Sequence, residues 1–287
     1  MKPRSLAALF VGPQGLRPGW GILLFLVTGV AIYLLLLLVA PIDFASELGL
    51  FMSEAMLLAS VSAGTALMAW VEGRGVLSYG LSGPRAWPRF LWGSFWGAAL
   101  LTLLVGALLA SGHLAIERGF TAGADAIGYG ITYAGVLLVV AFAEEMLFRG
   151  YLQVTLARLI GFWPAACLLS LGFGLVHRGN PGENDVGLVS AMLIGGALCL
   201  CLRLSGSLWW GIGFHAAWNW AQAFLWGTPV SGFVLEGRWF EAQSLGDPLW
   251  SGGTTGPEGS LLCLPILGLT ALVIVRSFRR GDAAVSA

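Results

Sequence analysis

Charged residues are scarce in this chain of 287 residues: 10% are Asp, Glu, Lys or Arg, whereas 57% are hydrophobic. Soluble domains carry about 25% charged residues. Together with a mean hydropathy of +0.82, this shortage excludes an ordinary soluble domain and indicates a polytopic membrane protein. The net charge is zero, so the composition offers no basic surface for nucleic acid.

Several motifs of well-known hydrolases and metal sites are also missing. The four cysteines lie in apolar runs without a C-x-x-C pair, which favours small buried side chains over disulfides or zinc ligands. The sequence has no H-E-x-x-H, the commonest zinc-protease arrangement. It also has no G-x-S-x-G nucleophile elbow. Any catalysis must therefore use other groups.

Long apolar runs dominate what is present. A transmembrane helix needs about 17–25 mostly apolar residues, and the runs predict an all-α polytopic bundle of about eight such helices. They lie at 20–40, 49–71, 90–111, 130–157, 164–178, 186–204, 207–226 and 259–275. We expect a single transmembrane domain over residues 1–287, with short tails at 1–19 and 277–287. Gly93-x-x-x-Gly97 is typical of closely packed membrane helices.

Basic residues favour one orientation of this bundle. If the N-terminus is inside, the outer loops hold only Arg118, Arg178 and Arg238, and the inner segments hold eleven Lys or Arg residues. Because Lys and Arg accumulate on the cytoplasmic side, both termini are predicted to be cytoplasmic. The long outer loop at 227–258 contains aromatic residues and is expected to fold back on the membrane surface; the sequence assigns it no further role.

Ionisable residues inside the apolar runs point to a functional site. Charge in a bilayer costs about 2.5–3.5 kcal/mol per residue on insertion scales, so such residues usually face a protein interior and serve a function. Glu54 stands alone in the second run, and its role stays open. The other polar residues are Glu144, Glu145 and Arg149 in the fourth run, His177 in the fifth, and His215 and Asn219 in the seventh.

Helical spacing separates the two adjacent glutamates. Arg149 lies four residues after Glu145, the favourable order for an ion pair on a helix. Glu144 lies about 100° around the helix and is left to face another neighbour, where it can act as a general base. To reach the depth of His177 and His215, the helix that carries Glu144 must continue past Arg149 to about residue 157.

These residue types allow several chemistries. A glutamate and a histidine can polarise water for attack on a carbonyl without a covalent intermediate, and a histidine–asparagine pair can donate to the oxyanion. Alternatively, two histidines and a glutamate can hold one zinc ion. A non-enzymatic binding or immunity protein, or a transporter, could use the same groups, although no inverted repeat is evident.

Three motifs in order resemble the CPBP family of intramembrane proteases, which includes the CAAX prenyl endopeptidases and the bacterial abortive-infection or bacteriocin-immunity proteins. They are Glu144-Glu145-x-x-x-Arg149, Phe173-x-x-x-His177 and His215-x-x-x-Asn219, within a core at 128–226. By position, the resemblance implies that Glu144 and His177 activate water. It implies that His215 and Asn219 stabilise the oxyanion or shape the pocket, and that Glu145, Arg149 and Phe173 support them.

The resemblance implies an intramembrane endopeptidase in a prokaryotic cell membrane, acting on a membrane-bound peptide or protein that is lipidated if the substrate is of CAAX type. We expect no cofactor, because Asn219 is a poor zinc ligand and a good oxyanion donor. The alternative is one zinc ion at Glu144, His177 and His215. Gly256-Pro257-Glu258-Gly259, before the last run, also resembles bacterial members, and its Pro and Glu suit a helix start.

Overall fold

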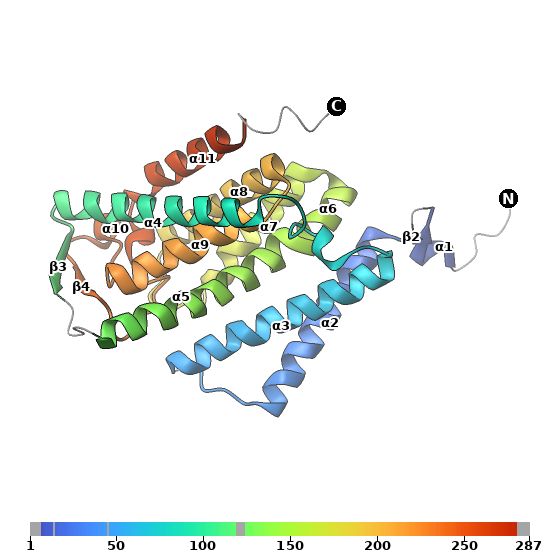
Figure 1. Cartoon of the computed structure of the whole chain (residues 1–287), viewed down its shortest axis with the longest axis horizontal. Helices are drawn as coiled ribbons and strands as arrows, with labels where there is room; N and C mark the ends of the chain where they lie inside the picture. The colour runs from blue at the N-terminus through green and yellow to red at the C-terminus, as the bar shows by residue number, and fades with distance from the viewer. Residues whose placement is uncertain (1–6, 14, 45, 119–123, 280–287) are drawn as a thin grey trace.

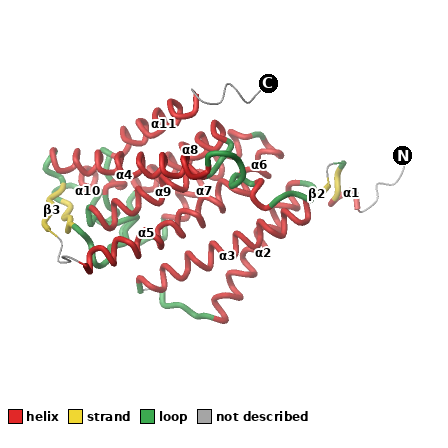
Figure 2. Tube along the Cα trace, viewed as in Figure 1, coloured by secondary structure: helices red, strands yellow, loops and turns green. Residues whose placement is uncertain are grey.

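A computed structural model describes residues 7–13, 15–44, 46–118 and 124–279 and shows an all-α polytopic membrane protein (Figures 1 and 2). A helix lies at each of the eight predicted positions. Five helices of the described chain are long and apolar enough to cross a membrane, and two further apolar helices are shorter. The principal helices are α2 (Pro18–Val39), α3 (Glu47–Glu72), α4 (Ala86–Ala110), α5 (Ala124–Glu145), α6 (Leu152–Ile160), α7 (Phe162–His177), α8 (Asp185–Ser205), α9 (Trp209–Trp220) and α11 (Cys263–Arg279).

Short elements complete the described fold. Two π-helical segments, η2 (Met146–Tyr151) and η3 (Ala221–Leu225), continue α5 and α9. The 3-10 turns η1 (Val76–Ser78) and η4 (Pro257–Gly259) and the one-turn helices α1 (Ala7–Phe10) and α10 (Pro248–Ser251) lie in connections. Strands β1 (Val11–Gly12) and β2 (Gly15–Leu16) form one antiparallel pair, and β3 (Leu114–Arg118) and β4 (Phe240–Ser244) form another.

Helix α2 buries the least surface among the long helices. Only Gly21 and Phe25 are buried, and most of its Leu and Val side chains face outward, as lipid contact requires. Figure 1 shows α2 and α3 spreading into a V beside the other helices. The bundle interior therefore belongs mainly to the long helices other than α2, including α3.

Glycine contacts fix α9 against α4. A Cβ atom on Gly93 would lie 2.1 Å from the Trp210 carbonyl oxygen, and one on Gly97 would lie 2.2 Å from that of Phe214. From the other side, a Cβ on Gly213 would lie 2.1 Å from the Phe90 carbonyl oxygen. The close packing predicted from Gly93-x-x-x-Gly97 is confirmed. It positions the helix that carries His215 and Asn219.

The loop at 227–258 folds back over the ends of the helices. Strand β4 pairs with β3, with Leu114 opposite Ser244 and Arg118 opposite Phe240. Glu236 of the loop donates its backbone N–H to Glu47 at 2.8 Å and accepts from the Tyr133 hydroxyl at 2.7 Å. Its apolar residues then reach the bundle interior, where Leu235 is buried. The loop therefore helps to close the interior cavity described below.

Candidate active site

The predicted ion pair between Glu145 and Arg149 is present and buried. Arg149 Nη1 lies 3.0 Å from Glu145 Oε1, and each side chain is only 1% exposed. The guanidinium also lies over the Phe173 ring, with Cζ 4.3 Å from the ring centroid. Phe173 of the second motif therefore supports the first motif by a cation–π contact.

The helix that carries Glu144 and Glu145 continues past Arg149, as the expected depth of His177 and His215 requires, but it is not regular. Residues 146–151 form a π-helical segment, and Gly150 has φ −79° and ψ −119°, outside the helical range. The prediction of an uninterrupted helix over 130–157 was therefore wrong at this point. Glycine has no Cβ and accepts such a conformation, and π-helical turns are frequent at functional sites. The π-helical segment follows directly after the two glutamates, and Gly150 lies near its end.

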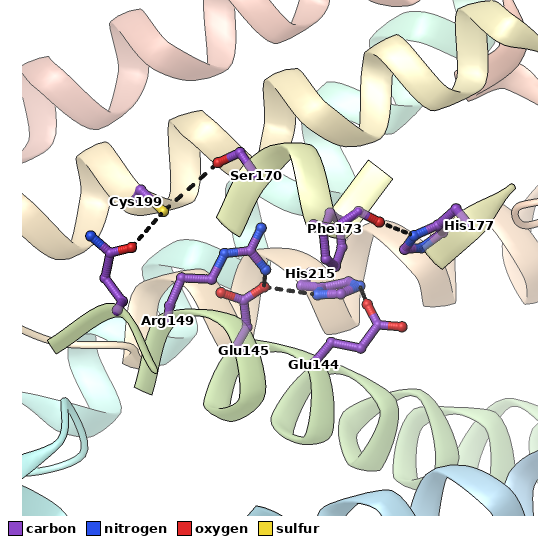
Figure 3. Close-up of polar contacts among 9 residues, drawn as sticks. Glu144, Glu145, Arg149, Ser170, Phe173, His177, Cys199 and His215 are labelled. Carbon is purple, nitrogen blue, oxygen red and sulfur yellow. Dashed lines mark hydrogen bonds and ion pairs between the residues drawn. The ribbon is translucent and has the colours of Figure 1, made fainter. Parts of the chain in front are cut away.

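His215 lies between the two glutamates (Figure 3). Its Nδ1 is 3.2 Å from Glu145 Oε1, and its Nε2 is 3.6 Å from Glu144 Oε2. Because Glu145 is the hydrogen-bond acceptor, the geometry assigns a proton to Nδ1. Glu145 thus fixes the orientation of His215 as well as pairing with Arg149, a contact that the sequence did not predict. Glu144 Oε2 is buried and accepts no hydrogen bond from the residues that the structure describes.

His177 ends α7 and is oriented by its own helix. Its Nδ1 donates to the Phe173 carbonyl oxygen at 2.7 Å, and its ring packs 4.7 Å from the Phe173 ring. The other ring nitrogen, Nε2, remains for a ligand or water. No direct hydrogen bond joins His177 to Glu144 in the described chain. Any joint action of the two requires a bridging group.

One cavity of about 460 Å³ inside the bundle brings the predicted residues together. Glu144 from α5, His177 from α7, and His215 and Asn219 from α9 all line it. Glu54 of α3 lines the same cavity, and its Oε2 is buried without a hydrogen-bond partner. Most of the remaining lining is Leu, Val, Phe and Ile. The cavity therefore combines an apolar wall with few polar groups, as ligand sites usually do.

Two further carboxylates line the cavity, and sequence reasoning assigned neither to the site. Glu183, just before α8, accepts from the backbone N–H of Asn184 at 3.1 Å. Glu258, in η4, accepts from the backbone N–H of Ser231 and, at 2.6 Å, from the Ser231 hydroxyl. Burial, and next the nearby Glu258 carboxylate, raise the pKa of Glu183 to about 7.

Pro257 and Glu258 do begin a helix, as predicted, but it is the short η4 and not the last long helix. These residues form a separate 3-10 turn, and α11 begins only at Cys263, later than the predicted residue 259. Glu258 instead points back to the 227–258 loop, where it holds Ser231. The hydrophobic pattern could not show this, because the contact depends on how the loop folds.

The donor set that zinc would need is not assembled. In residues 7–13, 15–44, 46–118 and 124–279, no group of three or more His, Cys, Asp or Glu side chains is arranged to hold a metal ion. This includes Glu144, His177 and His215, although all three line the cavity. Asn219, the fourth residue, is a poor zinc ligand.

Comparison with known families agrees with the motifs. Residues 126–221 match the family model described as "Type II CAAX prenyl endopeptidase Rce1-like". The match covers a third of the chain, contains all three motifs and confirms the resemblance to CPBP intramembrane proteases. It supports a membrane-embedded protease of CAAX type with a membrane-associated substrate. Neither the curated proteins nor the solved structures provide a match.

Proposed function

We propose that this integral membrane protein is an endopeptidase that hydrolyses a peptide bond of a membrane-bound substrate with water activated by Glu144 and His177. The observation that carries the proposal is the shared cavity: four residues predicted from three motifs line one space inside the bundle. Glu144 Oε2 accepts no hydrogen bond from the described residues, and His215 Nε2 lies 3.6 Å from it. That oxygen is available to a water molecule.

In the proposed reaction, Glu144 accepts a proton as the water oxygen attacks the carbonyl carbon, so that an O–H bond breaks and a C–O bond forms. His177, with Nδ1 engaged by Phe173, uses Nε2 to orient the same water. When the C–N bond breaks, the proton held by Glu144 passes to the departing amine nitrogen. No covalent enzyme intermediate forms.

The oxyanion needs donors on the opposite side of the substrate carbonyl. Asn219 offers a neutral NH₂ group. In the proposed mechanism His215 is doubly protonated, so that its Nε2–H also faces the cavity while Glu145 accepts from Nδ1–H. Preorganised donors of this kind typically contribute about 10²–10³ in rate. Glu145 and Arg149 act at a distance from the substrate, by fixing His215 and the kinked helix.

Peptide cleavage by purified protein in liposomes tests the proposal. Glu144→Gln and His177→Ala should each lower the rate about 10²–10⁴-fold, with unfolding temperatures close to the parent. Glu241→Gln is the matched control, because Glu241 is 40% exposed and pairs with Arg238 away from the cavity lining. Undiminished cleavage by the Glu144 and His177 variants would refute the proposal.

We also propose that the reaction needs no metal ion. The poor fit of the residues to zinc and the donor character of Asn219 support this. Activity should survive exhaustive chelation, in protein that elemental analysis shows to be free of zinc, iron and manganese. One zinc ion per chain, with activity that disappears on its removal and returns on its addition, would overturn the metal-free mechanism.

The proposed orientation places both termini in the cytoplasm. Arg74, Arg85, Arg158 and Arg203 follow or precede helix ends on the side that the positive-inside rule assigns to the cytoplasm. Glu183 and Glu258 then belong to connections on the outer side. A fluorescent-protein fusion at the C-terminus should fluoresce, and an alkaline phosphatase fusion there should be inactive; the reverse pattern would contradict the orientation.

A further inference from the structure

The carboxyl groups that line the cavity are not balanced by Lys or Arg among the described lining residues. Its lining holds four carboxyl groups, from Glu54, Glu144, Glu183 and Glu258, and two histidines. None of the described residues that line it is Lys or Arg. Carboxylates in a poorly solvated space repel one another unless a proton or a cation compensates them. The proposed hydrolysis uses only Glu144.

Glu183 and Glu258 are held in place by separate segments. Glu258 Oε1 accepts both donors of Ser231, and its second oxygen accepts no hydrogen bond from the described residues. Glu183 accepts a hydrogen bond from the backbone N–H of Asn184, and the Thr255 side chain lies beside it. These neutral donors orient both carboxyl groups and bring no positive charge to them, so a cationic ligand would meet no competing cation.

Nearby arginines do not compensate these two charges. Arg178 pairs with Asp185 at 3.8 Å, and both side chains are mostly exposed. Arg238 pairs with Glu241 at 3.6 Å. The titratable groups that act on Glu183 are Glu258 from η4 and His177 from α7, and burial together with Glu258 outweighs His177 in raising the pKa of Glu183 to about 7.

An orphaned hydroxyl gives an independent sign of a missing ligand. Ser190 of α8 lines the same cavity, is 2% exposed and lies beside the Cys263 thiol, and its Oγ makes no hydrogen bond of normal geometry within the described residues. A buried hydroxyl without a partner costs about 1–3 kcal/mol. A ligand that carries N–H groups would satisfy it.

We propose that Glu183 and Glu258 select substrates with a Lys or Arg side chain near the scissile bond. Selective cleavage of such substrates depends on the proposed function, whereas selective binding of them does not. Glu258 and Ser231 lie beyond residues 126–221, so this part of the cavity is built by a segment outside the family match.

A lysine scan tests the selection. Membrane-anchored peptides of one sequence carry Lys, norleucine or Glu at successive positions, and their binding is measured to Glu144→Gln protein in liposomes, where no cleavage interferes. At one or more positions, Lys should bind about tenfold or more tightly than norleucine, and Glu should bind more weakly than either. A scan without any Lys preference would overturn the proposal.

Charge removal then tests the residues. Glu183→Gln with Glu258→Gln, which keeps the acceptor oxygens, should reduce the Lys preference to about threefold or less and leave norleucine binding unchanged. Asp185→Asn is the matched control, because Asp185 is 94% exposed beside the same turn, and it should keep the preference. If the double variant unfolds, Glu183→Gln alone is used and should lower the preference. A preference that survives charge removal refutes the assignment.

The same peptides distinguish failure of the substrate selection from failure of the proposed hydrolysis. Glu144-dependent cleavage without Lys preference would refute the selection and leave the proposed hydrolysis standing. Lys-selective binding that depends on Glu183 and Glu258, without cleavage by the parent protein, would support the cation-binding site and refute the proposed function.

Discussion

Replacement of Arg149 by methionine should expose how strongly the centre of the site depends on one buried charge pair. Arg149 and Glu145 are 3.0 Å apart and each 1% exposed. Methionine matches the length of the arginine stem but leaves the Glu145 carboxylate with the His215 N–H as its one hydrogen-bond donor among the described side chains. Breaking a buried ion pair from one side costs about 3–5 kcal/mol, and we expect Arg149→Met to lose about that much.

A second variant shows whether the loss comes from the stranded charge. Glu145→Gln combined with Arg149→Met removes both charges, and glutamine keeps a carbonyl oxygen that can accept from His215 Nδ1. Replacement of both partners is often close to neutral, so the double variant should recover most of the lost stability. Its His215 should also remain in place.

Denaturation in mixed detergent micelles, followed by the fluorescence of the 13 tryptophans, measures both changes. A loss below about 1 kcal/mol for Arg149→Met would be the value of an exposed pair and would refute the buried geometry. A double variant as unstable as the single one would show that packing of the guanidinium on Phe173, and not the stranded carboxylate, causes the loss.

Two other changes follow from the same structure. Gly97→Ala puts a Cβ 2.2 Å from the Phe214 carbonyl oxygen, so it should lower the free energy of unfolding by about 1–3 kcal/mol and slow cleavage by moving α9. Gly106→Ala, whose Cβ would meet nothing within 4 Å, should change neither stability nor cleavage. Equal behaviour of the two variants would contradict the close packing. Burial, with Glu258 next, raises the pKa of Glu183 from 4.5 to about 7, so the folded state binds more protons and stability should fall as pH rises between these values. Glu183→Gln should flatten that slope in unfolding measurements, and an unchanged slope would contradict the assignment.

Features encoded by local spacing were predictable from the sequence. The helix positions follow from apolar runs of bilayer length. The Glu145–Arg149 pair follows from four-residue spacing on one helix, and it forms as expected. The same spacing placed His215 and Asn219 on one face of α9, and both line the cavity.

Contacts between distant segments were not predictable in this way. The placement of His215 between two glutamates depends on how α9 packs against its neighbours, which the periodicity of one helix does not specify. The kink at Gly150 replaces a regular helix where the sequence shows no proline. Glu183 and Glu258 lie in turns, so no hydrophobic pattern marks the direction of their side chains.

The catalytic role of Glu144 is the central claim, and a single-turnover experiment on Glu144→Gln tests it most directly. Excess protein in liposomes is mixed with a membrane-anchored peptide that the parent protein cleaves, and bound and cleaved peptide are measured in the same samples. We expect Glu144→Gln to bind the peptide with an affinity within about threefold of the parent protein and to cleave it at least about 100-fold more slowly. Cleavage within about tenfold of the parent rate, at equal binding, would contradict the assignment of Glu144 as the base.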